Sequence, residues 1–408
     1  MENHQHKVYV GVDVHRQEHR VAIMPIALLH RLESNWKQAK FLDIKNNSSD
    51  FELLDAAIRE HILCPDEAAI AVDHTGGHYS EPLVYFLQGK GYNVYHLEPK
   101  AVKAARERLL DEESKSDTID AASTAYLLYL RDVHGLSFRI SAVTPELGSK
   151  ASVLRCLVIQ RQQYNKLATQ FTNRLHQLLL AVFPEGEAKY FSKLLKITPY
   201  YPTPQDILTS QNLKGIKNVS HADKEIIMAL ASQTVGAPGK VYRELIRDLS
   251  RQRNEAIAKR EAITDLIEKE VATHPYGAIL LSFPYFGSIA AATIIGVVRD
   301  IDRWPSKKKL KKALGVYSTL KQSGTSAGKG RMGKEGSRHG RRVLFQVVFR
   351  CIRSATPDND FKDYYLRQVA RGKPRLKAVV STMGKLAEII YHCLSTGELY
   401  QYQRNINP

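Results

Sequence analysis

The sequence predicts an α/β domain, then a long helical segment and a mainly helical C-terminal domain. Three observations support this. Apolar runs alternate with amphipathic stretches up to about residue 135, a heptad-like spacing follows, and short helices surround a glycine-rich basic loop after His274. A chain of 408 residues exceeds one ordinary core. We therefore expect domains at 1–145, 146–273 (with a helical insertion at 184–240) and 274–408.

The first domain is expected to contain a mixed sheet. Its short apolar runs predict strands at 7–13, 20–27, 39–45, 68–73 and 92–97. Helices are expected at 49–61, 80–90, 99–109 and 117–131. The first three strands follow one another without helices, as in a meander, and the later ones alternate with helices, which favours parallel pairing. This order is typical of a ribonuclease-H-like, or RuvC-like, sheet.

The second segment is expected to form a coiled coil, as an antiparallel hairpin or a dimerisation arm. A first helix should end at Phe183-Pro184, and a second should cover about 241–272. The first carries a 4-3-4-3 spacing at Leu157, Arg161, Tyr164, Ala168, Phe171, Leu175, Leu178 and Val182. Arg161 is its one polar break. The second has a weaker version at Leu245, Leu249, Ala256, Ile263 and Leu266.

The last domain is expected to be mainly helical. An apolar helix is predicted at 288–298 and a basic helix at 306–314. A glycine-rich loop at 322–340 follows, and helices at about 341–354 and 375–395 end the domain.

Four aspartates occupy positions that folding alone does not require. Asp13 and Asp73 end apolar strands, and Asp117 and Asp120 open a predicted helix three residues apart. Hard cations such as Mg²⁺ (or Mn²⁺) take carboxylate and phosphate oxygens, and paired metals of this kind support phosphodiester chemistry. The alternative is that the first two form turns and the others favour a helix N-terminus.

Positive charge is concentrated in one segment. The chain has a formal net charge of +17 and a pI of about 9.5, which indicates a polyanionic partner. Between Ile301 and Gln346, 13 basic residues oppose two acidic ones, a net +11. Phosphate contact is the favoured interpretation and a solvated basic loop the alternative. The candidate nucleic-acid-binding residues are Lys307, Lys308, Lys309, Lys311, Lys312, Lys329, Arg331, Lys334, Arg338 and Arg341.

Other chemistry-bearing residues are less specific. A serine can attack a phosphodiester when it is activated, but Ser318, Ser323, Ser326 and Ser337 all lie in or beside the basic loop. The chemistry alone does not choose among them. His74 and His78 have helical zinc spacing, but Gly76-Gly77 breaks a helix there.

The predicted compartment is the cytoplasm. The four cysteines are isolated, which favours a reducing environment. No signal-peptide core or membrane span is expected, and no basic amphipathic helix suited to a membrane surface stands out.

These residues resemble the DEDD transposases and recombinases of the insertion-sequence one-ten and eleven-eleven family, which includes the Piv and MooV invertases. Val10-Gly11-Val12-Asp13 resembles the opening motif, and Lys115-Ser116-Asp117-Thr118-Ile119-Asp120-Ala121 resembles the motif with the last two acids. Asp73-His74-Thr75-Gly76 resembles the second motif, where the family usually has glutamate.

The resemblance continues in the last domain. Phe283-Pro284-Tyr285-Phe286-Gly287 is similar to the family's Ile-Pro-Gly-Ile-Gly turn of a helix-hairpin-helix-like element, with Tyr285 in place of glycine. The stretch Leu314 to Gly324 resembles the one that ends in the family's Ser-Gly, which selects Ser323 as the nucleophile. Residues 373–378 fit the closing segment.

The resemblance implies a bacterial transposase or site-specific DNA recombinase. It would cut and rejoin double-stranded donor and target DNA through a Ser323–phosphate bond, while the four aspartates hold Mg²⁺. A structured non-coding RNA would guide it, and exchange would need a dimer or tetramer, whose acids and serine come from the same or different protomers. Two alternatives stay open: a RuvC-like junction nuclease that uses water, and a non-catalytic nucleic-acid-binding protein.

Overall fold

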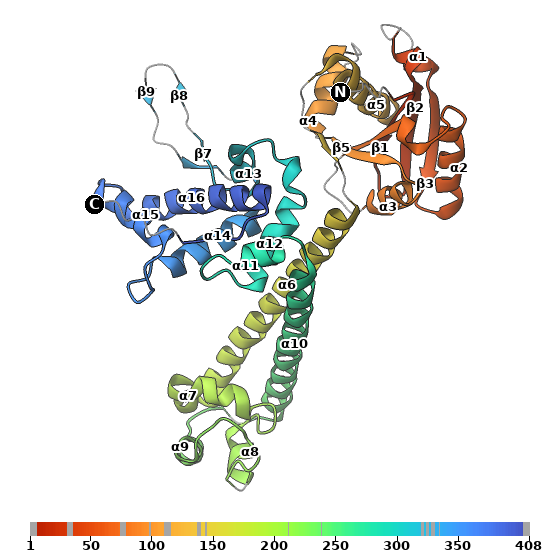
Figure 1. Cartoon of the computed structure of the whole chain (residues 1–408). Coiled ribbons are helices and arrows are strands. Elements are labelled where there is room, and N and C mark those ends of the chain that lie inside the picture. Colours follow the sequence, from red (N-terminus) through yellow and green to blue (C-terminus); the bar gives the residue numbers. More distant parts are fainter. Residues whose placement is uncertain are drawn as a thin grey trace. The chain divides into compact units, whose positions relative to one another are not determined.

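The computed structural model describes residues 6–30, 36–73, 79–97, 99–109, 116–136, 140–142, 145–210, 212–237, 239–319, 322–323, 326–327, 331–333 and 335–402 (Figure 1). The chain forms two compact units. Unit 1 contains residues 1–149 and 298–309, and unit 2 contains residues 150–297 and 310–408.

Unit 1 is built on a six-stranded mixed sheet in the order β3-β2-β1-β4-β5-β6. The strands are β1 (Val8–Asp13), β2 (Glu18–Pro25), β3 (Lys40–Lys45), β4 (Ala68–Asp73), β5 (Asn93–Leu97) and β6 (Ile140–Ala142). β1, β2 and β3 pair antiparallel as a meander, and β1–β4 and β4–β5 pair parallel. The five predicted strands are confirmed to within two residues. β6, which pairs antiparallel with β5, was not predicted because three residues carry too little periodicity.

Helices cover both faces of this sheet. They are α1 (Ile26–Leu29), α2 (Ser48–Arg59), α3 (Glu81–Gly89), α4 (Pro99–Leu109) and α5 (Asp117–His134), with short 3₁₀ turns η1 (Trp36–Gln38) and η2 (Pro65–Glu67). The side chains of Val8, Val10 and Val12 pack with α2 and α3 in one core. Tyr9, on the opposite face of the same strand, packs with α4 and α5 in the other. Alternation along β1 thus fixes both layers.

Unit 2 contains two long helices, α6 (Pro145–Val182) and α10 (Lys240–Thr273), of 38 and 34 residues. Hydrogen bonds join Arg161 Nε to Thr264 Oγ1 at 2.8 Å and Arg253 Nε to Thr172 Oγ1 at 3.0 Å. Moving eleven residues forward on α6 therefore moves the partner eleven residues back on α10, so the two helices pair antiparallel. The polar break predicted at Arg161 is one of these contacts between the helices.

The predicted register holds for α6 and is wrong in part for α10. All eight α6 positions are buried or half-buried. In α10, Leu245 and Leu266 are exposed, and the neighbouring Ile246 and Ile267 are buried instead. Ile246 packs in the core of the insertion, and this second partner accounts for the burial of Ile246 in place of Leu245. Coiled-coil supercoiling itself stays a prediction.

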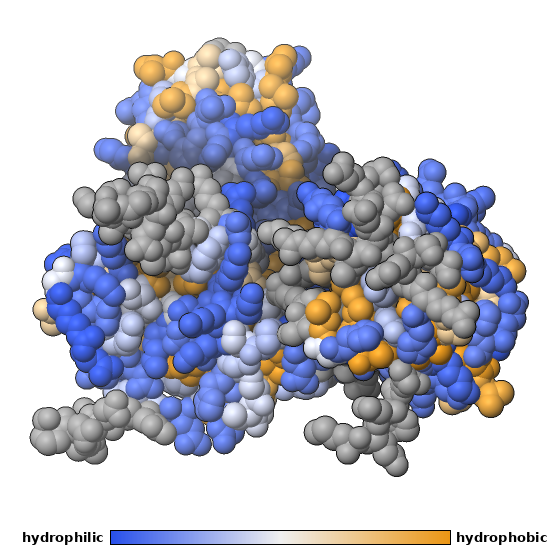
Figure 2. Space-filling view, turned by 90° about the horizontal axis from the view of Figure 1, so that it is seen from above, coloured by the Kyte–Doolittle hydropathy of each residue, from blue (hydrophilic) through white to orange (hydrophobic). Residues whose placement is uncertain are grey.

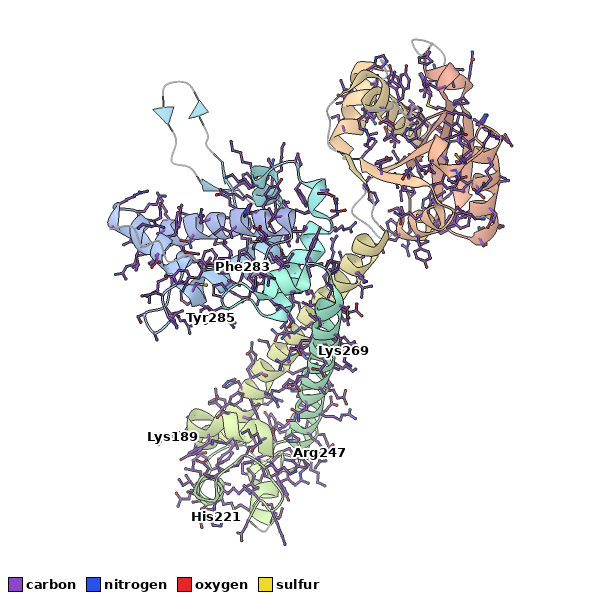
Figure 3. All side chains as sticks on the ribbon, viewed as in Figure 1. Lys189, His221, Arg247, Lys269, Phe283 and Tyr285 are labelled. Carbon is purple, nitrogen blue, oxygen red and sulfur yellow. The ribbon has the colours of Figure 1, made fainter. Side chains whose placement is uncertain are left out.

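The insertion at 184–240 folds as helices α7 (Pro184–Ile197), α8 (Pro204–Thr209) and α9 (His221–Ser232). Its core includes Leu194, Ile207 and Ile227, and it continues into Leu175 and Leu179 of α6. Lys189 and His221 mark two of its helices in Figure 3. The insertion is thus packed onto the end of the helix pair.

The C-terminal part of unit 2 is a helical bundle. Its helices are α11 (Gly277–Leu281), α12 (Ser288–Val298), α14 (Arg338–Cys351), α15 (Asp360–Ala370) and α16 (Arg375–Thr396). The 3₁₀ turn η3 (Ile301–Arg303) and the start of helix α13 (Lys307–Ala313) belong to unit 1, and α13 enters unit 2 at Leu310. α11 and α15 were not predicted. Four strands of two residues each interrupt the glycine-rich stretch: β7 (Ser318–Thr319), β8 (Gln322–Ser323), β9 (Ser326–Ala327) and β10 (Arg331–Met332).

The visible surface is mainly hydrophilic, with separate hydrophobic patches (Figure 2). Within the part of the chain that the structure describes, no helix has the length and apolar character needed to cross a bilayer.

Candidate functional site

Asp13 and Asp73 end neighbouring strands of unit 1. β1 and β4 are parallel, and their last paired residues are Val12 and Val72. The carboxyl ends of parallel strands meet at the same edge of a sheet, so the backbones of Asp13 and Asp73 are neighbours at that edge. Asp13 is buried, with 5% of its surface exposed. For Asp73 the backbone is described, and its side chain lies outside the described residues.

The other two acids stand in the first turn of α5. Ser116 caps this helix, and its hydroxyl accepts a hydrogen bond from the Ile119 backbone N–H. Arg20 of β2 donates to Thr118 Oγ1 at 3.1 Å and so ties the first turn to the sheet. Asp117 is exposed and Asp120 is buried.

Gly11 brings α5 onto the sheet. A Cβ at this position would collide with the backbone of α5, at the Ala121 carbonyl oxygen and the Ala125 nitrogen. Only glycine therefore lets β1 approach α5 this closely. The opening motif thus contains both Asp13 and Gly11. Gly11 allows close packing of α5, the helix that carries Asp117 and Asp120.

His15 links two of the aspartates. Its Nε2 lies 3.1 Å from Asp13 Oδ2 and 3.2 Å from Asp117 Oδ2. One ligand atom from each of these three residues falls within 4.8 Å of the others, so they form a cluster able to hold a metal ion. His19 supports the loop, because its Nδ1 accepts a hydrogen bond from the His15 backbone N–H at 3.3 Å. Sequence reasoning did not single out His15, whose only signal is its position two residues after Asp13.

Asp120 has a cationic partner that the sequence did not reveal. Arg106 of α4 donates from Nη1 to Asp120 Oδ1 at 2.6 Å, and both residues are buried. A buried carboxylate needs such a partner. The arginine holds one Asp120 oxygen, and Asp120 is not part of the three-residue cluster.

The electrostatics of Asp13 suit a cation. Burial raises the pKa of the Asp13 carboxyl, His15 opposes that rise, and Asp117 and Asp120 add to it. Neighbouring carboxylates that repel one another are stabilised by a divalent ion, and their oxygens are the donors that Mg²⁺ or Mn²⁺ prefers.

Ser323 lies on a hairpin of unit 2. β7 pairs antiparallel with β10 at its base, and β8 pairs with β9 further along, where Ser323 stands opposite Ser326. The backbone positions of these two serines are described, and their side chains lie outside the described residues. We call residues 318–332 the serine hairpin.

Glycines and one arginine anchor the base of the serine hairpin. Gly333 lies against the Tyr317 ring where a Cβ would collide, and Gly336, at φ +84°, has no room beside the Lys312 carbonyl. Arg341 Nη1 donates to the carbonyl oxygens of Gly333 at 2.9 Å and Gly315 at 3.4 Å. Arg341, which was predicted to bind nucleic acid, thus stabilises the base of the serine hairpin. Gly333 and Gly336 allow the close packing there.

The predicted basic residues fall into different environments. Lys307, Lys308 and Lys309 are exposed on α13. Lys311 pairs with Glu388 of α16 at 2.7 Å, and Lys312 pairs with Glu335 at 3.0 Å. Arg338 is exposed at the start of α14. Three candidates lack a described side chain: Arg331, Lys329 and Lys334, the last two lying wholly outside the described residues, as do His74 and His78.

Comparison with known proteins bears on both units. Residues 10–184 match the DEDD model for IS110 elements, described as "Transposase", and residues 277–366 match the model described as "Transposase IS116/IS110/IS902 family". The chain is also similar to the "Insertion element IS110 uncharacterized 43.6 kDa protein" of Streptomyces coelicolor. Identity is 26% over 325 residues, which cover 76% of this chain and 78% of the relative. Residues 10–184 and 277–366 are therefore similar to two domains of IS110-family transposases.

Proposed function

We propose that the protein is an RNA-guided DNA recombinase that moves an insertion element in the bacterial cytoplasm, at the nucleoid. Its RuvC-like domain would supply the acids Asp13, Asp73, Asp117 and Asp120, and the serine hairpin would supply Ser323. The observation that carries the proposal is the convergence of Asp13, His15 and Asp117 beside Asp120 at the end of the sheet, in a chain with IS110-family transposase domains.

The proposed reaction conserves the phosphodiester bond energy. Ser323 Oγ attacks a DNA phosphorus and loses its proton, the Oγ–P bond replaces one backbone P–O bond, and the departing deoxyribose oxygen takes up a proton. A hydroxyl of another strand then reverses the step and releases the serine. A divalent ion held by the aspartates would neutralise charge at the phosphate.

The chain's own residues would prepare that site. Arg106 fixes Asp120, Ser116 and Arg20 fix the first turn of α5, and His15 contacts both Asp13 and Asp117. Such supporting contacts set the precision of a metal site.

The decisive experiment uses a suicide DNA substrate and the guide RNA. Wild-type protein should form a covalent adduct that mass spectrometry maps to Ser323. Ser323→Ala should lose adduct and strand exchange by a factor of about 10³ or more, yet bind DNA. Ser326→Ala is the matched control and should be mild. Cleavage by Ser323→Ala at the wild-type rate would instead identify a junction nuclease that uses water.

The metal part of the proposal has separate variants. Asp13→Ala and Asp120→Ala should abolish Mg²⁺-dependent cleavage and leave DNA binding nearly unchanged. Asp73→Glu, which restores the usual family acid, should keep activity. Wild-type cleavage by Asp13→Ala would contradict the assignment, and so would full cleavage activity in EDTA. Nucleic-acid binding without cleavage at any metal concentration is the result expected of a purely binding protein.

Binding to DNA and guide RNA is proposed to use the exposed part of the basic segment. Lys307, Lys308 and Lys309 should contact phosphates without reading sequence. Replacing them with glutamine should flatten the log–log salt dependence of duplex binding by about 0.9 for each phosphate that is no longer neutralised. An unchanged slope would show that these lysines stay solvated.

We further propose that a dimer or tetramer carries out exchange. Mixing inactive Asp13→Ala with inactive Ser323→Ala tests whether acids and serine come from different protomers. Restored activity in the mixture means that they do. Two inactive proteins that stay inactive when mixed mean that one protomer supplies both, and a monomer that exchanges strands would contradict the oligomer.

A further inference from the structure

Helix α14 exposes two phenylalanine rings on the face opposite the one that it packs against the bundle. Val343, Leu344, Val347 and Val348 are buried in the bundle, none more than 7% exposed. Phe345 and Phe349, by contrast, are 38% and 47% exposed. At 100° per residue these two rings share one solvent-facing arc of the helix with Arg342, Gln346 and Arg350, all of them exposed.

The aromatic groups on this arc form a ladder of flat surfaces. The rings of Phe345 and Phe349 stack with centroids 5.9 Å apart and an interplanar angle of 16°. The guanidinium of Arg353 lies 5.5 Å from the centroid of the Phe349 ring. Exposed aromatic rings with a neighbouring arginine are the groups on which unpaired bases stack.

A cationic cavity adjoins the ladder. It has a volume of about 510 Å³ and is lined from α14 by Arg342, Gln346 and Arg350. α6 contributes Arg161 and Lys166. Among its lining residues four cations face one carboxylate, Glu268, so the cavity attracts anions. Burial and then the cations around it, Lys166 and Arg342 among them, lower the pKa of the nearby His339.

The first turn of α12 also borders the cavity, through Gly287 and Ser288. The positive end of a helix dipole favours a phosphate there. Before it stands Tyr285, a cavity residue at φ +59°, which is a backbone conformation that costs a tyrosine free energy (Figure 3). Such strain is a reason to look for a function of this side chain.

We propose that the α14 ladder and this cavity form a binding site for an unpaired DNA strand, with bases stacked on Phe345 and Phe349 and backbone phosphate held by Arg161, Lys166, Arg342 and Arg350. Duplex DNA hides its base faces, so the site selects unpaired nucleotides. The inference builds on the proposed function, because strand exchange separates base pairs, and it assigns a holding place for a separated strand.

The test is equilibrium binding of the full chain to a thymine oligonucleotide and to a duplex of equal length, in EDTA so that the acidic site is inactive. Phe349→Ala should weaken oligonucleotide binding roughly tenfold and duplex binding little. Arg342→Gln and Arg350→Gln should each flatten the single-strand salt slope by about 0.7. Tyr200→Ala, which removes an aromatic ring 67% exposed on the surface, is the matched control.

A spectroscopic variant reports stacking directly. Phe349→Trp should preserve affinity, and its fluorescence should be quenched by the oligonucleotide. The natural Trp36 and Trp304 are buried, so the wild-type signal should change little. Equal weakening of duplex and single-strand binding in Phe349→Ala would overturn the proposal, and so would tighter binding of an RNA of matching sequence.

A dimer that dissociates in Phe349→Ala would also overturn the proposal, because the face would then be a protein interface. None of these readouts needs catalysis. A failed serine adduct would therefore remove the proposed recombination and leave this site standing, and the reverse also holds.

Discussion

The acidic site and the serine hairpin are built in opposite ways. Asp13, Asp117 and Asp120 stand at the end of a central strand and in the first turn of a helix, and both of these elements contribute side chains to the core of unit 1. Ser323 stands on two-residue strands, and the described anchors of its hairpin are the β7–β10 pairing, Arg341 and tightly packed glycines. Disturbing the packing that positions the acids should therefore damage the fold, whereas disturbing the base of the serine hairpin should damage the reaction and leave the fold.

The largest expected effect separates the two regions by stability. Gly11→Val should destabilise unit 1 by about 3 kcal/mol or more, because a side chain would force β1 and α5 apart. Thermal or urea unfolding measures it. Gly89→Ala, where added carbon meets no atom within 4 Å, is the control and should change stability by less than about 1 kcal/mol. Equal effects of the two variants would contradict the close-approach argument.

A glycine at the base of the serine hairpin should show the opposite pattern. Gly336→Ala places carbon against the Lys312 carbonyl at a positive φ, so the chain entering α14 must move. We expect at least about a tenfold loss of strand exchange, since misplaced reacting groups cost rate steeply. Far-ultraviolet circular dichroism should stay that of the wild type. A variant that is globally unfolded would refute the separation.

Arg341 sharpens the comparison, because sequence and structure assign it different roles. If it mainly holds the Gly333 and Gly315 carbonyls, Arg341→Gln should destabilise unit 2 by about 1–2 kcal/mol. Its duplex-binding salt slope should match that of the wild type. A slope flatter by about 0.9 with unchanged stability would restore the phosphate-contact interpretation.

The smallest effect concerns the charge on Asp13. Since folding raises its pKa, the stability linked to its protonated form is present at acidic pH and lost as pH rises through the folded pKa. Asp13→Asn is neutral throughout, so at pH 7 in EDTA it should melt higher by about 2–4 °C, corresponding to about 1 kcal/mol. The advantage should shrink near pH 3 and reverse in saturating Mg²⁺. A variant less stable than the wild type at pH 7 in EDTA would show that Asp13 is not strained by its charge.

Strands β1 to β5 of the main sheet could be predicted from the sequence because each has its own apolar run. Asp13 and Asp73 could be predicted as candidate site residues because they end two of those runs. His15 and Arg106 were missed for a physical reason. An exposed histidine in a loop and an arginine on an amphipathic helix have no local pattern that names their partners, and both act through contacts made only after folding. In α10 the heptad was misassigned between Leu245 and Ile246, since the insertion competes for the same face.

The antiparallel pairing of α6 and α10 limits which insertions and deletions these two helices can accept. Polar bonds at Arg161–Thr264 and Arg253–Thr172 fix its register, since a slip by one residue would leave these half-buried guanidinium groups without partners. At about 1.5 Å of rise per residue the pair is a spacer on the order of 50 Å long. Viable relatives and engineered versions should therefore gain or lose equal numbers of residues in both helices, in steps of seven, and an insertion in one helix alone should be tolerated only beyond the last of these bonds.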